Sequence, residues 1–254
     1  MRKHAFETPG GEVWLWGDEG ALESQRPVVL FINGAFSIER PRSFELQAAL
    51  PAAAVFNAHL PGNHSPPPTA HSVDAYGRAY SAAIDQIGRP AIVMGASVGA
   101  LTVLSMRSPL IRGLVLLEPF LKSRAAAPLV GAFRERLLAA PQDAELRDFL
   151  WTVFGVSETA HENRDYRALA DALTLPAIAA FGGAREPGPG GPLPSLVDDA
   201  DREYLRTHPQ VRTEVIPGVG HNLPGFAPNH TRRYAQTLLD EHVLSRTTLR
   251  EDRN

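Results

Sequence analysis

One pentapeptide constrains the fold of this chain more than any other feature: Gly95-Ala96-Ser97-Val98-Gly99. The residues before it, 90–94, form a short apolar run that is typical of a buried parallel strand. The residues after it, 100–106, place apolar side chains at helical spacing. A strand that turns directly into a helix leaves no room for side chains two positions either side of its apex, which explains the two glycines. We therefore expect a sharp turn that exposes the Ser97 hydroxyl.

The composition narrows the class of protein. A chain of 254 residues is long enough for one α/β domain with an insertion. The net charge of −3 and the lack of a basic run argue against nucleic acid as a partner. Because the chain has no cysteine, disulfides, thiolate nucleophiles and zinc–sulfur sites are excluded.

The sequence also bears on localisation. Residues 1–7 are charged and lack the apolar stretch of a secretory signal. No window approaches the roughly 18 uninterrupted apolar residues of a membrane-spanning helix. We expect a cytoplasmic protein with no membrane partner.

Strand and helix patterns alternate along most of the chain. A Pro-Gly-Gly turn at 9–11 predicts an opening hairpin over residues 4–16. Further strands are predicted at 27–32, 53–57, 90–94, 112–118, 176–181 and 213–216, and helices at 40–50, 72–88, 100–106 and 226–243. This alternation predicts an α/β fold with a mostly parallel central sheet and helices on both of its faces.

Residues 120–172 break the alternation. They are rich in helical pattern, with one apolar stripe at Leu129, Phe133, Leu137 and Leu138 and a second at Leu146, Phe149, Leu150 and Phe154. We interpret them as a small helical lid, called the cap segment below. Residues 1–119 and 173–254 then form the core.

A histidine late in the chain completes a recognisable arrangement. Residues 213–216 read as a last strand, and Gly218 and Gly220 lie in the loop that carries His221. With the Ser97 turn, this ending resembles the lidded, esterase-like serine branch of the α/β-hydrolase superfamily over most of the chain. The resemblance implies Ser97 as nucleophile, His221 as general base, a small-molecule substrate, and neither cofactor nor metal.

The acid that should orient His221 has more than one candidate. Relatives place it after the strand that follows the lid, in a Gly-x-x-Asp pattern, and residues 182–186 (GGARE) put Glu186 at that position. Some relatives instead place the acid at the end of the strand after the nucleophile's helix, where this chain has Glu118. We favour Glu186, with Glu118 as the alternative and Asp198 or Asp199 as remaining options.

An oxyanion formed by acyl attack needs preorganised N–H donors. The turn supplies the N–H of Val98, and the resemblance places the second donor after the strand at 27–32. Relatives often carry His-Gly-x there, whereas this chain has Asn33-Gly34-Ala35, so Ala35 is the expected donor. Gly34 permits the close turn beside the pocket. Phe36 is equally consistent with a pocket wall and with ordinary core.

Two remaining features suggest no chemistry of their own. His59, His64 and His71 lack the spacing and the carboxylate neighbours of a metal site. The Pro/Gly-rich loop at 187–194 is interpreted as a surface insertion, with a flap beside the pocket as the alternative.

The function predicted from these residues is hydrolysis of an ester, thioester or similar acyl bond of a small, largely apolar substrate. A Ser-His-Glu triad would act through an acyl-enzyme. The alternative is a non-hydrolytic protein on the same scaffold, either a ligand-binding protein or a lyase, isomerase, acyltransferase or peptide-tailoring enzyme. The motifs specify neither the substrate nor the oligomeric state.

Overall fold

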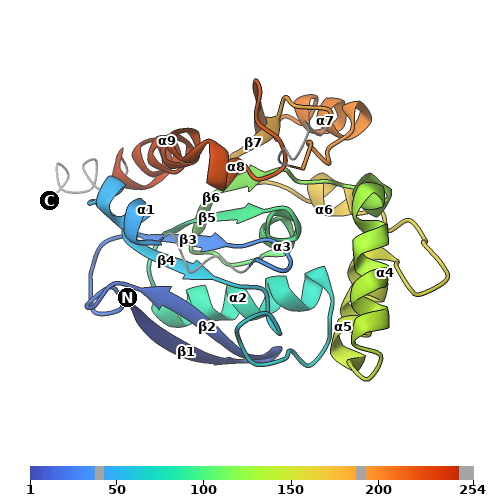
Figure 1. Ribbon diagram of the computed structural model, residues 1–254. Helices are drawn as coiled ribbons and strands as arrows, with labels where there is room; N and C mark the ends of the chain where they lie inside the picture. The colour runs from blue at the N-terminus through green and yellow to red at the C-terminus, as the bar shows by residue number, and fades with distance from the viewer. Residues whose placement is uncertain (38–42, 187–192, 246–254) are drawn as a thin grey trace, which may run out of the picture.

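The structure is a computed structural model that describes residues 1–37, 43–186 and 193–245. Its centre is an eight-stranded sheet in the order β1-β2-β4-β3-β5-β6-β7-β8 (Figure 1). The strands are β1 Arg2–Thr8, β2 Gly11–Gly17, β3 Val28–Ile32, β4 Ala54–Ala58, β5 Ala91–Ala96, β6 Ile111–Leu117, β7 Ala177–Gly182 and β8 Val211–Ile216. The β1–β2 and β2–β4 pairs are antiparallel, and every other pair is parallel. The predicted fold class is confirmed.

Helices cover both faces of the sheet. Along β3, Val28, Leu30 and Ile32 join one buried cluster, whereas Val29 and Phe31 join the other, as the two-residue period of a strand requires. The first cluster includes side chains from α2 Val73–Ile87 and α3 Val98–Ser105. The second includes side chains from α1 Ser43–Ala49 and α9 Pro228–Leu239. The remaining helices of the core are α7 Asp199–Arg206, the short α8 Leu223–Phe226 and the π-helical turn Asp240–Leu244.

Helix α2 illustrates how local sequence sets an element's ends. The Ser72 hydroxyl accepts a hydrogen bond from the N–H of Ala75 at 3.1 Å, which caps the first turn. Gly88 adopts a left-handed conformation with φ of 73° and closes the last turn through its N–H on Ile84 O. The helix predicted at 72–88 is therefore confirmed, and its two end residues, Ser72 and Gly88, are the caps of α2.

The cap segment lies between β6 and β7. It contains a 3₁₀ helix at Ser123–Leu129, α4 Val130–Ala139, α5 Ala144–Phe149, a π-helical turn at Leu150–Phe154 and α6 Arg167–Asp171. Phe133, Leu137 and Phe149 are buried, as the apolar stripes predict. Leu138 is 71% exposed, so its assignment to the first stripe is wrong. One step along a helix rotates a side chain by about 100°, which carries Leu138 off the face that holds Leu137.

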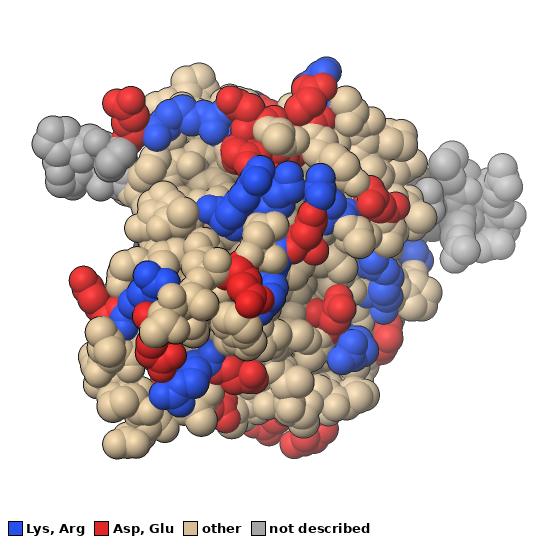
Figure 2. Space-filling model, turned by 90° about the vertical axis from the view of Figure 1, so that its right-hand side faces the viewer, with Lys and Arg blue, Asp and Glu red and all other residues tan. Residues whose placement is uncertain are grey.

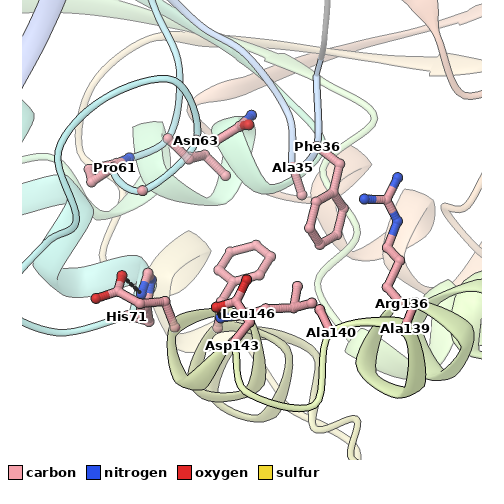
Figure 3. A pocket seen from close by; sticks show the side chains of 14 residues that line it. Ala35, Phe36, Pro61, Asn63, His71, Arg136, Ala139, Ala140, Asp143 and Leu146 are labelled. Atoms are coloured by element: carbon pink, nitrogen blue, oxygen red, sulfur yellow. Dashed lines mark hydrogen bonds and ion pairs between the residues drawn. The ribbon is translucent and has the colours of Figure 1, made fainter.

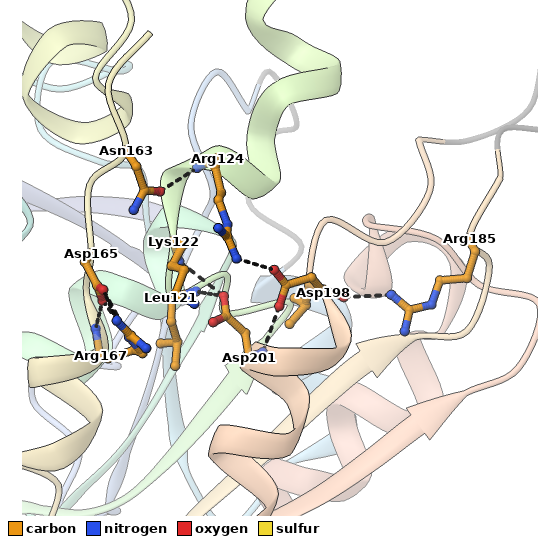
Figure 4. Close-up of polar contacts among 10 residues, drawn as sticks. Leu121, Lys122, Arg124, Asn163, Asp165, Arg167, Arg185, Asp198 and Asp201 are labelled. Carbon is orange, nitrogen blue, oxygen red and sulfur yellow. Dashed lines mark hydrogen bonds and ion pairs between the residues drawn. The ribbon is translucent and has the colours of Figure 1, made fainter.

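The two ends of the cap segment run side by side (Figure 4). The N–H of Ser123 donates to Arg164 O at 2.9 Å, and the N–H of Tyr166 donates to Leu121 O at 2.7 Å. The buried Asp201 carboxylate of α7 accepts the N–H groups of Leu121 and Lys122 at 2.9 and 3.2 Å. Burial, reinforced by Asp198, raises the pKa of Asp201. The polar sequence of α7 gave no apolar stripe, and this helix was missed in the sequence analysis.

The outer face of the cap carries mixed charge. Figure 2 turns this side of the molecule to the viewer and shows Lys and Arg side chains bordered by Asp and Glu side chains. Ion pairs there join Arg147 to Glu158 at 3.2 Å and Arg164 to Glu162 at 3.1 Å. Among the helices in the described ranges, none is both long and apolar enough to cross a membrane.

The buried His59, directly after β4, makes stability depend on pH. Burial, with a smaller contribution from His64, lowers the pKa of His59 from 6.5 to about 4. Between these values the unfolded chain binds a proton that the folded chain does not, so the free energy of unfolding falls as pH falls from 6.5 to 4. We expect this residue to account for up to about 3 kcal/mol of that loss.

Urea unfolding of the wild type and His59→Gln at pH 7 and pH 4.5 measures this contribution. The variant should lose less stability between the two pH values than the wild type. An unchanged pH dependence in His59→Gln would show that His59 is protonated in the folded state.

Candidate active site

The turn at residues 95–99, called the serine turn below, joins β5 directly to α3. Ser97 lies between the two elements with φ of 57° and ψ of −121°, a conformation that costs a non-glycine residue strain energy. A Cβ at Gly95 would lie 2.2 Å from Gly99 O, and a Cβ at Gly99 would lie 2.3 Å from Ile32 O. Both glycines are therefore required because backbone crosses at those points, as the pentapeptide predicts.

A buried carboxylate lies beside the serine turn, one strand over. Glu118 follows β6 directly, has φ of 55° and is 1% exposed. Its Oε1 accepts hydrogen bonds from Gly182 N at 2.6 Å and from the Ser195 hydroxyl at 2.7 Å. Its Oε2 accepts Leu196 N at 2.9 Å and lies 3.0 Å from His221 Nδ1. Three donors thus fix the carboxylate, and the fourth contact is the imidazole.

His221 lies in the loop after β8, where the sequence analysis expects it. Its N–H donates to Leu193 O at 2.8 Å, and its side chain is only 15% exposed. With Nδ1 engaged by Glu118, Nε2 is the ring nitrogen left for chemistry. Ser97 and His221 line one cavity of about 270 Å³, called the Ser97 cavity below. Within the described residues, no hydrogen bond joins the two side chains.

The structure brings Glu118, not Glu186, to the imidazole, and we correct the preference for Glu186 accordingly. The chain after β7 is anchored by Gly183 N on Ile216 O and by Ser195 N on Ala184 O. Glu186 lies beyond these anchors and is exposed, with no contact to His221 among the described residues.

The two aspartates that remained as options are engaged elsewhere. The Asp198 carboxylate caps α7 by accepting a hydrogen bond from the N–H of Asp201 at 2.8 Å. The Asp199 carboxylate forms an ion pair with Arg185. Neither carboxylate is therefore available to orient His221.

The loop after β3 lies against the serine turn. The Asn33 side chain donates to Asn57 Oδ1 at 2.6 Å and to Ala58 O at 2.8 Å, which ties the start of this loop to β4. A Cβ at Gly34 would lie 3.2 Å from Ser97 Cβ, so glycine permits the close approach. No hydrogen bond found among the described residues uses the backbone N–H of Ala35 or Val98. Both candidate oxyanion donors are thus available to a ligand.

A family model described as "Alpha/beta hydrolase family" matches residues 29–236, which span the Ser97 turn, Glu118 and His221. The chain belongs to the α/β-hydrolase family. No curated protein matches the sequence.

Solved structures of several hydrolases share the fold. A thermophilic esterase from Thermogutta terrifontis is 17% identical, covers 95% of this chain and 99% of its own, and has a TM-score of 0.64. Carboxylesterase CesB from Bacillus subtilis is 14% identical over 94% of this chain and 92% of its own, with a TM-score of 0.64. Esterase RhEst1 from Rhodococcus sp. ECU1013 is 16% identical over 95% of this chain and 100% of its own, with a TM-score of 0.65. At these identities the likeness establishes the fold alone.

A second and larger cavity of about 440 Å³ lies between the core of this hydrolase-family chain and helices α4 and α5 (Figure 3). We call it the cap cavity. Ala35 and Phe36 line both this cavity and the Ser97 cavity. The Phe36 ring packs against Phe133 and Phe149 of the cap segment, with ring centroids 5.7 and 5.5 Å apart. Phe36 is therefore both a packing residue and the wall that the two cavities share.

Of the histidines set aside in the sequence analysis, His71 has polar partners and His59 packs against His64. His71 Nδ1 lies 2.7 Å from the Tyr76 hydroxyl, and His71 Nε2 lies 3.0 Å from Glu145 of α5. His59 is buried, with its ring centroid 4.9 Å from that of His64. Within the described ranges there is no group of three or more His, Cys, Asp or Glu side chains that could hold a metal ion.

Sequence reasoning missed the residues that hold Glu118 and those that connect the cap to the core. Ser195 and Leu196 lie outside any motif, and Glu145 and Arg136 belong to the cap segment, where the pattern indicates helix and no more. A polar residue at one position of an amphipathic helix carries no signal of what it faces.

The close contact at Gly99 gives a test of the serine turn. Gly99→Ala places a methyl group against the Ile32 carbonyl, and backbone cannot yield as a side chain can. We expect the free energy of unfolding to fall by about 1–3 kcal/mol. Urea unfolding measures the loss.

Gly131→Ala is the matched control. A Cβ at Gly131 of α4 meets nothing within 4 Å, so alanine there should leave stability unchanged or raise it slightly. A Gly99→Ala variant as stable as Gly131→Ala would mean that β3 and the serine turn are farther apart in solution.

Proposed function

We propose that this chain is a serine hydrolase that cleaves an ester, thioester or similar acyl bond through an acyl-enzyme. Ser97 is the nucleophile, His221 the general base and Glu118 the acid of the triad. One observation carries the proposal. The buried Glu118 carboxylate is hydrogen-bonded to Nδ1 of His221, and the His221 ring lines the same cavity as Ser97. A carboxylate in this position holds the imidazole in the tautomer whose Nε2 can accept a proton.

The first half of the reaction forms the acyl-enzyme. His221 Nε2 removes the proton from Ser97 Oγ as Oγ attacks the substrate carbonyl. In the absence of substrate the two side chains are not hydrogen-bonded, so their contact must tighten when substrate binds. The N–H groups of Ala35 and Val98 then stabilise the oxyanion.

The second half releases the acid. Before this half begins, the imidazolium has given its proton to the leaving group, whose departure completes the acyl-enzyme, and Glu118 stabilises the imidazolium while it exists. A water molecule, activated by His221, then attacks the acyl-enzyme and frees Ser97. The cap segment, acting as a lid, would shield this step from bulk water.

Two features favour a small and mostly apolar ester as the substrate. The cap cavity is walled by aromatic and aliphatic side chains, among them Phe36, Leu146 and Phe149. The structural neighbours from Thermogutta, Bacillus and Rhodococcus are described as esterases or a carboxylesterase. We therefore place esters ahead of thioesters and amides.

Covalent labelling tests the nucleophile. A fluorophosphonate probe should label the wild type at one site and should not label Ser97→Ala. In parallel, p-nitrophenyl esters from acetate to decanoate should be hydrolysed by the wild type only, with a chain-length optimum set by the cavities. A wild type that neither labels nor hydrolyses any member of the series would favour the non-hydrolytic alternative.

Two glutamine variants test the acid. Glu118→Gln keeps the shape of the side chain but cannot hold the imidazole in the productive tautomer, so kcat should fall by about 10³–10⁴. Glu186→Gln alters an exposed side chain and should keep kcat within about twofold. Circular dichroism of both variants controls for folding. Equal and mild losses would exclude both glutamates as the acid.

A further inference from the structure

Arg136 is an exposed charged residue that lines the cap cavity. It lies near the end of α4, and its guanidinium carbon is 4.6 Å from the centroid of the Phe36 ring. No hydrogen bond or ion pair to its guanidinium is found among the described residues. The contact with the aromatic face holds the guanidinium in place while leaving its N–H edge open to a ligand.

The acidic groups in the wall of the same cavity are already engaged. Glu145 bonds His71 Nε2 at 3.0 Å, and Asp143 caps α5 by accepting Leu146 N at 2.8 Å. Figure 3 shows Arg136 and His71 at opposite ends of the cavity. Among the described residues of the wall, a ligand therefore meets two partnered carboxylates and, at the far end, the unpartnered guanidinium of Arg136.

Two other arginines of the cap segment have protein partners. Arg134, on the same helix, donates to Ser157 O at 3.2 Å, and Arg147 pairs with Glu158 at 3.2 Å. Arg136 alone of the three faces the cavity without a protein acceptor.

The position of Arg136 relates it to the proposed reaction. Phe36 separates the Ser97 cavity from the cap cavity, and Arg136 lies over the Phe36 ring. A substrate whose reacting carbonyl lies in the Ser97 cavity can extend past Phe36 and bring its far end to the guanidinium. The aliphatic and aromatic walls between them suit a short methylene chain.

We propose that the cap cavity is a carboxylate subsite, so that the substrate is an ester with a carboxylate several carbon atoms from the reacting carbonyl. The planar guanidinium matches a carboxylate through paired N–H···O bonds, and Arg136 is the residue that determines this specificity. This inference rests on the proposed serine hydrolase function.

Matched ester pairs test the subsite. The first pair is p-nitrophenyl hexanoate and mono-p-nitrophenyl adipate, which share six acyl carbons and differ in the terminal carboxylate. The second pair, butyl acetate and the acetate ester of 4-hydroxybutanoate, places the carboxylate on the alcohol side and is followed by pH-stat. In at least one pair the wild type should prefer the carboxylate member by about ten- to hundredfold in kcat/KM, after Ser97→Ala turnover is subtracted.

Variants assign the preference to Arg136. In Arg136→Gln the ratio of the two kcat/KM values within that pair should fall towards one. Arg134→Gln removes a charge from the same helix and should keep the wild-type ratio. A wild-type ratio near one in both pairs, or a ratio that Arg136→Gln leaves intact, would overturn the subsite while leaving the hydrolase in place.

Binding separates the two proposals. Isothermal titration with adipate should give a dissociation constant at least tenfold weaker for Arg136→Gln than for the wild type and Arg134→Gln. If no ester shows Ser97-dependent turnover, this difference still supports the carboxylate subsite and only the hydrolase proposal fails. Equal adipate affinity in all three proteins, or no binding to any, would refute the subsite.

Discussion

The hydrogen bonds to the Glu118 carboxylate hold together the segments that form the candidate active site. They join the end of β6 to the end of β7 through Gly182, to residues 195–196, and to the loop after β8 through His221. Burying a carboxylate without hydrogen-bond donors costs free energy. The three segments are therefore held relative to one another, because each supplies a donor to Glu118. The same requirement sets the position of the imidazole beside the serine turn.

Much of the architecture could be predicted from the sequence because its signals are local. The strand and helix periods, the Ser72 and Gly88 caps of α2 and the two glycines of the serine turn each depend on a few neighbouring residues. The choice of acid depends instead on segments that meet only in the folded chain. Glu186 fits a spacing pattern. Glu118, in contrast, accepts hydrogen bonds from residues 182, 195 and 196, and the spacing of residues in the sequence does not predict these contacts.

The cap segment shows the same division. Its apolar stripes predicted helices that bury Phe133 and Phe149. What the helices present to the cavity could not be read from the stripes, because Arg136 and Glu145 look like any polar position of an amphipathic helix. Their roles are set by Phe36 and His71, which come from loops roughly 75 to 100 residues earlier in the sequence.

The paired ends of the cap segment have a consequence for how such a chain can diversify. Residues 121–123 and 164–166 leave and re-enter the core at one point, held by backbone hydrogen bonds and by Asp201 of α7. These hydrogen bonds of the junction involve no residue between 124 and 163, whereas that stretch packs on the core separately, through Phe133 and Phe149 on Phe36. Changes between residues 124 and 163 therefore alter the wall of the cap cavity without touching the hydrogen bonds that close the junction.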